Sequence, residues 1–363
     1  MKKITCFMFF LLFLGLSSCG EDNTSSEKIF SEKDEIPLYF NIANEYISLG
    51  LLDKAREEID RVIKIDAKNP ESYQLLGFID TLENKSDEAI KNFEKAISLD
   101  DKYAQAYHLI SLEYIKQGNL EKAKEYLLKL ETFNPDIFTL SNLGNVYFAD
   151  KNYDEAEKYL NKAIQLNENY HTPYATLAKI AIKDGKNEKA IEYLKKASKI
   201  KPDSIDSHVT LGNLYLGQFK LDEAQKEFEA VLSIDPDFVD VYSRIAFIYI
   251  EKNINLDKAA AFIQKGMKIE KGNELKYLDT LAWLEYRKGN FNKAKEHIDK
   301  LLEVVKVRTE FPPTYKALVF FHKGNIEYKL KNKNSAKEYL QKADENGLLD
   351  KYSKQSKEIL STL

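Results

Sequence analysis

Apolar positions recur along most of this chain with the spacing of a helix. Within stretches of about twelve residues, apolar side chains fall at i, i+3, i+4 and i+7, which is the period of one helix face. The stretches come in pairs that are separated by short turns such as Gln117-Gly118-Asn119 and Asp184-Gly185-Lys186. The pattern therefore predicts helix–turn–helix units and an all-α chain.

An alanine recurs about every 34 residues, in the second stretch of each pair. These alanines are Ala55, Ala89, Ala123, Ala156, Ala190, Ala224, Ala259, Ala294 and Ala336. A fixed period of this length is typical of a solenoid, in which one helix pair stacks on the next. A solenoid binds through an extended surface, so the period also predicts a function that depends on a surface and not on a single catalytic pocket.

A small residue recurs in the first stretch of each pair, at Gly77, Gly144, Ala178, Gly212 and Ala246. Gly or Ala at this place, together with the alanine of the second stretch, allows two helix backbones to approach closely. We therefore expect the two helices of each pair to cross at these positions.

The combined pattern resembles the tetratricopeptide repeat, which reads W-x2-L-G-x2-Y, then A-x3-F, then A and P. Tyr or His stands in place of the Trp at Tyr73, Tyr107, Tyr174, His208 and Tyr242. The resemblance covers residues 36–347 and implies an α-solenoid, a right-handed superhelix of about nine repeats. The units begin near Ile36, Pro70, Ala104, Ile137, His171, Ile205, Val239, Leu275 and Ala317.

Two places depart from the regular period. The turn around residues 253–256 is expected to be one residue longer than its counterparts. The connection 303–316 is stretched and contains Pro312-Pro313, which cannot lie inside a helix, so it is either a hinge or a long rigid loop. The final stretch, 348–363, has the amphipathic pattern of a helix that caps the last repeat.

The first residues predict export. Lys2 and Lys3 precede an apolar run over 4–16 that is too short to span a bilayer, and small residues then precede Cys19. Residues 1–18 resemble a bacterial lipoprotein signal, which implies cleavage before Cys19 and attachment of acyl chains to it. More than one acyl chain gives stable membrane anchoring. The alternative is an ordinary secretory signal with an incidental cysteine.

Residues 19–35 are polar and charged, so we expect a lipidated cysteine followed by a flexible tether. Glu21 and Asp22 resemble the acidic export tags of surface lipoproteins, although a solvated linker has the same composition. The resemblance implies an outer-membrane lipoprotein of the bacterial cell envelope and leaves its leaflet open.

Charge and composition argue against nucleic acid as a partner. The 363 residues are 31% charged with a net charge of −4, and Lys and Glu are interleaved without a basic stripe. Cys19 is the only cysteine outside the predicted signal, so neither a disulfide framework nor a cysteine metal site is expected.

The sequence also lacks the motifs of the common enzyme classes. The histidines are His108, His171, His208, His297 and His322, and none forms a metal-ligand pair such as HExxH. There is no GxSxG, Walker-type loop or GxGxxG. We therefore predict no catalysis, no metal and no cofactor. His208 holds the place of Tyr73 and Tyr174, which indicates a packing residue.

The family resemblance implies that the first helix of each pair lines a concave surface. Inward side chains then fall at the second, fifth, ninth, twelfth and thirteenth places of a unit. The predicted partner-binding residues are Gln74, Phe78, His108, Leu112, Lys116, Asn145, Phe148, Lys179, Lys183, Asn213, Phe247, Ile250, Trp283, Tyr286 and Arg287. Aromatics would anchor an extended segment of a partner and amides would bond its backbone, with Trp283 as the first candidate for mutation. Alternatively, Phe78 and Phe247 pack between neighbouring first helices.

Three functional hypotheses follow. The leading one is a non-catalytic, membrane-anchored adaptor that binds other envelope proteins or peptide segments through the concave face. The second is capture of a carbohydrate or peptidoglycan fragment on the same aromatic groove. The third is self-association, in which the end of one array occupies the concave face of another.

Overall fold

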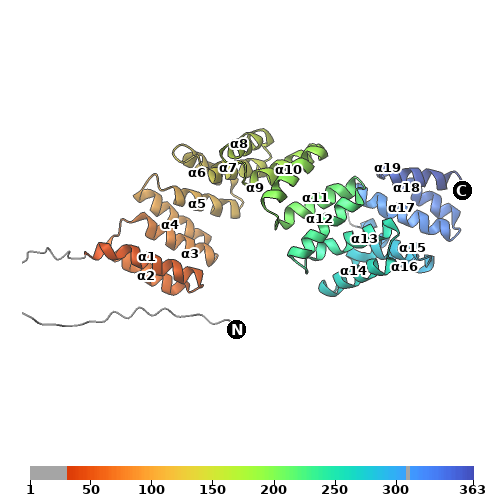
Figure 1. Ribbon diagram of the computed structural model, residues 1–363, viewed down its shortest axis with the longest axis horizontal. Coiled ribbons are helices and arrows are strands. Elements are labelled where there is room, and N and C mark those ends of the chain that lie inside the picture. The colour runs from red at the N-terminus through yellow and green to blue at the C-terminus, as the bar shows by residue number, and fades with distance from the viewer. Residues whose placement is uncertain (1–30, 308–310) are drawn as a thin grey trace, which may run out of the picture. The chain divides into compact units, whose positions relative to one another are not determined.

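The computed structural model describes residues 31–307 and 311–363. The predicted signal 1–18, Cys19 and most of the predicted tether therefore lie outside the described residues. Every regular element in the described part is a helix, as Figure 1 shows. Over the same two ranges, no helix is both long and apolar enough to cross a membrane.

The helices form pairs with a short turn inside each pair. The first helices are α1 (Ile36–Ser48), α3 (Pro70–Leu82), α5 (Ala104–Lys116), α7 (Ile137–Ala149), α9 (His171–Lys183), α11 (Ile205–Gly217), α13 (Tyr242–Lys252), α15 (Leu278–Arg287) and α17 (Pro313–Lys329). The second helices are α2 (Leu52–Ile65), α4 (Ser86–Leu99), α6 (Leu120–Glu131), α8 (Tyr153–Leu166), α10 (Asn187–Ile200), α12 (Leu221–Ile234), α14 (Leu256–Ile269), α16 (Phe291–Val307) and α18 (Lys333–Glu345). The predicted all-α solenoid is confirmed.

Short 3-10 helices precede some of the pairs. They are η1 (Glu32–Glu35), η2 (Val239–Val241) and η3 (Glu274–Tyr277), and α19 (Asp350–Leu360) follows the last pair. The first six helix starts coincide with the predicted unit starts. In the seventh and eighth units, η2 and η3 occupy the predicted start. In the ninth, α17 begins at Pro313, four residues before Ala317, because proline fits the first helical turn, where no N–H partner is needed.

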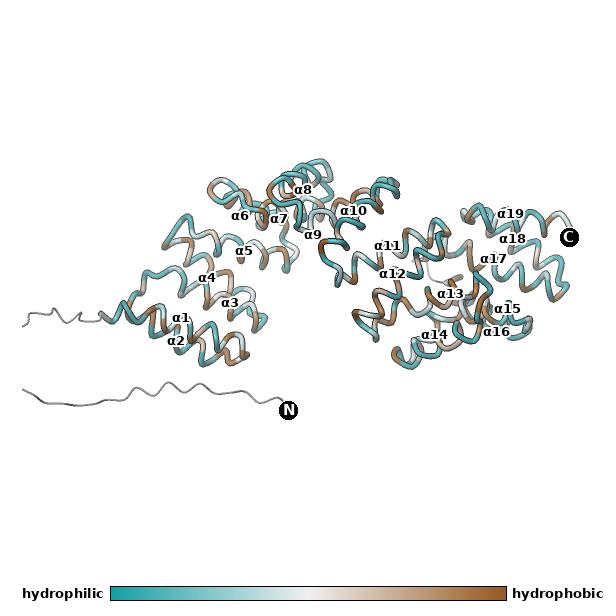
Figure 2. Tube along the Cα trace, in the orientation of Figure 1, coloured by the Kyte–Doolittle hydropathy of each residue, from teal (hydrophilic) through white to brown (hydrophobic). Residues whose placement is uncertain are grey.

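The chain divides into two compact units, and the boundary along the sequence falls in α5 between Glu113 and Tyr114. In the first unit, apolar side chains of α1, α2 and α3 form a core that includes Phe40, Ile59 and Ile79. Hydropathy along the trace in Figure 2 alternates within each helix, as expected for helices with one buried face.

Gly77 and Gly212 of the first helices lie where the paired helix approaches closely. A Cβ at Gly77 would lie 2.6 Å from the ring of Phe93, and one at Gly212 would lie 2.6 Å from the ring of Phe228. Each ring stands four residues beyond a repeat alanine, Ala89 or Ala224. The predicted close crossing is confirmed, and the aromatic ring of the second helix is what fills it.

The turn at 253–255 differs from the others, but not as predicted. It has three residues, like the turn 218–220 of the preceding pair. The extra residue instead lengthens the helix: α13 ends six residues beyond Ala246, whereas α11 ends five beyond Gly212. Two asparagines, Asn253 (φ 53°) and Asn255 (φ 47°), then adopt the left-handed conformation that asparagine tolerates. The prediction of a longer turn was wrong.

In the second unit, α19 does more than cover the ninth pair. The ring of Tyr352 lies 4.8 Å from that of Phe321 in α17 and 5.8 Å from that of Phe219 in the turn after α11. Lys351 Nζ lies 3.5 Å from the centre of the Phe219 ring and 3.7 Å from Glu251 Oε2 of α13. The predicted capping helix is therefore present, and it also packs against the sixth and seventh pairs. The predicted hinge at 303–316 lies partly outside the described residues.

Candidate functional site

The second unit contains a pocket of about 1100 Å³. One set of its lining residues comes from the sixth to eighth pairs and includes Asn213, Leu216, Asp240, Ser243, Arg244, Phe247, Lys276, Asp279 and Thr280. Another set comes from α16, α17, α19 and the connections beside them, and includes Leu301, Val304, Phe311, Tyr315, Leu318, Leu349 and Tyr352. The first helices of three repeats and the C-terminal helices thus share one pocket.

Two of the predicted partner-binding residues, Asn213 and Phe247, line this pocket. Both stand at the ninth place of their units. Asp240 and Ser243 also line it, and they hold the second and fifth places of the seventh unit. The repeat places could have identified them, because the same spacing that selects Phe247 also selects these two.

Charged groups around the pocket are mostly paired. Lys276 Nζ lies 2.5 Å from Asp240 Oδ1 and 3.2 Å from Glu270 Oε2. Asp279 Oδ1 lies 2.8 Å from Nδ1 of His322, a fully buried histidine of α17. The carboxylates of Asp240 and Asp279 therefore pair with Lys276 and His322, and neither pairs with Arg244.

Arg244 is the exception. Its Nη1 donates a hydrogen bond to the backbone oxygen of Asp240, and among the described residues no carboxylate lies within ion-pair distance of it. Burial lowers the pKa of Arg244, although the nearby charge of Asp240 acts in the opposite direction. An arginine remains protonated in proteins, so the pocket wall carries a positive charge without an acidic partner.

Trp283 and Ile250 do not lie on an open surface. Trp283 is 2% exposed, its Nε1 donates to Glu251 Oε1 at 2.5 Å, and its ring stacks on Tyr286 at 4.6 Å and on His322 at 4.2 Å. Ile250 is completely buried. The prediction that their side chains contact a partner is corrected here, because α17 packs against α15 and covers Trp283. The same burial prevents Trp283 from stacking on a sugar.

Other predicted residues of the second unit lie apart from the pocket. Lys179 and Lys183 are exposed on α9; Lys179 Nζ lies 3.1 Å from Asp206 Oδ2, and Lys183 Nζ lies 5.0 Å from the centre of the Tyr153 ring. Asn145 is half-buried and accepts a 2.7 Å hydrogen bond from Thr176. The remaining members, Lys116, Phe148, Tyr286 and Arg287, are exposed or half-buried.

In the first unit, Gln74 is buried, whereas Phe78 and His108 are half-buried. Leu112 is 39% exposed. These four residues belong to the first compact unit, whereas the residues that line the pocket belong to the second.

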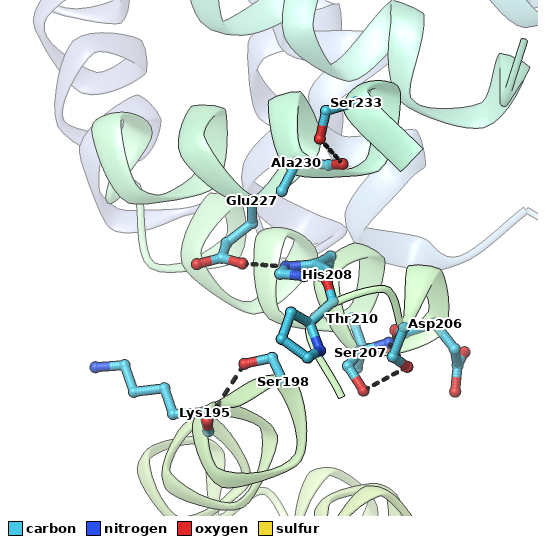
Figure 3. A network of polar contacts seen from close by, with 11 residues as sticks. Lys195, Ser198, Asp206, Ser207, His208, Thr210, Glu227, Ala230 and Ser233 are labelled. Carbon is cyan, nitrogen blue, oxygen red and sulfur yellow. Dashed lines mark hydrogen bonds and ion pairs between the residues drawn. The ribbon is translucent and has the colours of Figure 1, made fainter. Parts of the chain in front are cut away.

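His208 of α11 contacts both α12 and the connection before α11, and Figure 3 shows its contact with Glu227 of α12. Its Nδ1 lies 2.7 Å from Glu227 Oε2 of α12, and its Nε2 lies 2.9 Å from the backbone oxygen of Pro202. At the same repeat place, the hydroxyl of Tyr242 donates to the oxygen of Pro236. His208 therefore replaces tyrosine in a contact that holds the first helix to the preceding connection. No set of three His, Cys, Asp or Glu side chains in the described ranges is grouped as a metal would require.

Comparison with known families settles the repeat type. One tetratricopeptide repeat model matches residues 136–203, and another matches 36–69, 70–103, 104–137, 205–238 and 317–346. Together these matches cover more than half of the chain. The chain belongs to the tetratricopeptide repeat family. The two models leave residues 239–316 unmatched, and this is the segment in which η2 and η3 precede the first helices.

The chain is similar to a bacterial pilus assembly protein and to a mitochondrial import receptor subunit. The type IV pilus assembly protein PilF of Pseudomonas aeruginosa is 24% identical over 184 residues, which are 49% of this chain and 72% of PilF. The mitochondrial import receptor subunit TOM70 of Rattus norvegicus is 32% identical over 121 residues, which are 30% of this chain and only 20% of TOM70.

Solved structures share the fold. The PilF structure from Pseudomonas aeruginosa has a TM-score of 0.51 at 19% identity and covers 56% of this chain and 94% of PilF. The Cut9–Hcn1 hetero-tetramer of the APC/C has a TM-score of 0.52 at 17% identity, with 70% of this chain and 46% of that chain covered. These matches support the α-solenoid at the level of the fold.

Proposed function

We propose that this protein is a non-catalytic, lipid-anchored scaffold that binds other proteins of the bacterial cell envelope through the inward places of its repeats. The observation that carries the proposal is a solenoid of the tetratricopeptide repeat family that leaves Lys179, Lys183 and Asn213 exposed at those places. Extended repeat surfaces suit the binding of another chain.

The names of the relatives support a role among other proteins. PilF is named for pilus assembly and TOM70 for a receptor subunit. The proposed envelope location rests mainly on the lipoprotein-like segment that ends at Cys19. The name of PilF, a bacterial relative, adds support, because it refers to the assembly of a pilus. We place the protein at the outer membrane on this basis.

The two lysines of α9 give the proposed surface a chemical preference. Lys179 and Lys183 stand one helical turn apart, so their side chains emerge on the same face. Each already has one neighbour, the Asp206 carboxylate or the Tyr153 ring, and both remain exposed. We expect an acidic segment of a partner to bind across them, because opposite charges favour encounter and orientation.

The test is a pull-down from detergent-solubilised envelopes with the wild type and with the double variant Lys179→Glu/Lys183→Glu. Reversal of both charges should remove a specific partner from the recovered proteins. The expected loss is tenfold or more in partner yield, measured by quantitative mass spectrometry.

The matched control is Lys189→Glu/Lys196→Glu on α10, the second helix of the same pair. Its lysines are equally exposed, and they have equivalent neighbours: Lys189 lies over the Tyr193 ring and Lys196 pairs with Glu192. The control should recover the partner at the wild-type level. Equal recovery by both double variants would show that the partner does not bind to the inward places of α9.

A further inference from the structure

We infer that the pocket of the second unit binds a small amphipathic anion, in which an apolar body carries a single carboxylate that Arg244 holds. Lys179 and Lys183 of the proposed protein-binding surface do not line this site, whereas Asn213 does. Two features of the pocket lead to the inference: its lining and its unpaired guanidinium.

The lining suits an apolar body. Five apolar or aromatic residues from three helices and from the connection before α19 border the pocket: Leu216, Phe247, Tyr315, Leu318 and Leu349. A volume of about 1100 Å³ lies just above the usual range for small-molecule sites, which are mostly apolar with a few placed polar groups. Transfer of an alkyl chain from water into such a lining is favourable.

The polar groups of the pocket select for one negative charge. Asp240 pairs with Lys276 and Asp279 with His322, whereas Arg244 bonds only a backbone oxygen among the described residues. A guanidinium in this state has N–H groups left for a carboxylate, and its planar fork allows two parallel hydrogen bonds. Partial burial strengthens such a bond, because less water competes for the charge.

The C-terminal helix α19 contributes to the wall of the pocket. Tyr352 of α19 borders the pocket and packs against both Phe219 and Phe321. Lys351 of the same helix forms an ion pair with Glu251 of α13.

The experiment titrates the purified full-length protein with decanoate and with its neutral analogue decanamide, by isothermal titration calorimetry. The wild type should bind one decanoate, and decanamide should bind at least tenfold more weakly, because it lacks the charge that Arg244 neutralises. Arg244→Gln should weaken decanoate binding at least tenfold and remove the difference between the two probes. Arg244→Lys should restore part of that difference.

The matched control is Arg287→Gln. Arg287 is also a half-buried arginine of a first helix, but it does not line the pocket. This variant should bind decanoate as the wild type does. The Lys179→Glu/Lys183→Glu variant should also keep decanoate binding, so failure of the proposed scaffold function and failure of this inference can be told apart.

Three results would overturn the inference. The first is no decanoate binding to the wild type. The second is equal affinity for decanoate and decanamide in the wild type, a comparison that does not depend on whether any variant folds. The third is Arg244-dependent binding of a peptide with a free apolar C-terminus when decanoate does not bind, which would make the pocket a peptide site.

Discussion

At the residue scale, the most consequential group outside the pocket is a buried charge cluster in the ninth pair. Lys323 and Glu327 of α17 are 2% and 1% exposed, and Lys323 Nζ lies 2.6 Å from Glu327 Oε1. Glu327 also accepts hydrogen bonds from Lys295 of α16 and from Asn332. Burial alone would raise the pKa of Glu327, but these hydrogen bonds outweigh it and lower the pKa to about 2 from its ordinary 4.5.

A depressed pKa makes the contribution of Glu327 depend on pH. The unfolded chain binds this proton near pH 4.5, whereas the folded chain binds it only near pH 2, so the stabilisation is complete above 4.5 and is lost as pH falls to 2. We expect Glu327→Gln to lower the free energy of unfolding by about 3 kcal/mol at pH 7, because two lysines lose their buried partner. The difference from the wild type should shrink as pH falls from 4.5 to 2.

Urea unfolding at a series of pH values measures this effect. Glu338→Gln is the control, since Glu338 is an exposed residue that pairs with Lys342 on α18. An exposed pair contributes little, so this variant should stay within about 1 kcal/mol of the wild type. A Glu327→Gln penalty that is constant between pH 7 and pH 3 would contradict the assignment.

A second residue-scale prediction concerns Gly212. Alanine there places a Cβ 2.6 Å from the Phe228 ring, so either the ring or α11 must shift. We expect Gly212→Ala to lower the free energy of unfolding by about 1–3 kcal/mol, the usual cost of overpacking. Gly217→Ala in the same helix is the control, because nothing lies within 4 Å of the added Cβ. Thermal unfolding should show a lower midpoint for the first variant and not for the second.

At the element scale, the sequence predicts the repeated parts well and the non-repeated parts poorly. The alanine period and the small residues specify each helix pair, so α1 to α12 begin and end close to where the pattern indicates. The repeat places also identify Asn213 and Phe247 as pocket residues. The prediction that Trp283 is accessible was wrong. Phe321 and His322 of α17 pack against its ring, and the repeat period does not predict this contact.

The packing of α19 gives an element-scale prediction. Tyr352 is 2% exposed and contacts both Phe219 and Phe321, so Tyr352→Ala leaves a cavity between three segments. We expect the free energy of unfolding to fall by about 3–5 kcal/mol, as for other buried aromatics. Lys354→Ala, at an exposed site on the same helix, should change little. Similar midpoints for both variants in thermal unfolding would show that α19 is not held in place by Tyr352.

At the scale of the whole molecule, the proposed anchor is a property of the N-terminal segment and not of the solenoid. Cys19→Ser should abolish incorporation of a clickable palmitate analogue and release the protein from the membrane fraction, because stable anchoring needs more than one acyl chain. Gel fluorescence and fractionation measure the two effects. A wild-type protein that stays with membranes without any acyl label would contradict lipidation at Cys19.

The packing of α19 against the α11–α12 turn also bears on how the molecule responds to force. In a simple solenoid each pair touches only its neighbours, so pulling on the ends peels the pairs away one after another. Here a single apolar core runs from α9 to α19 and includes Leu211, Tyr249, Phe321 and Tyr352. The later pairs should therefore rupture together in one large step rather than one after another.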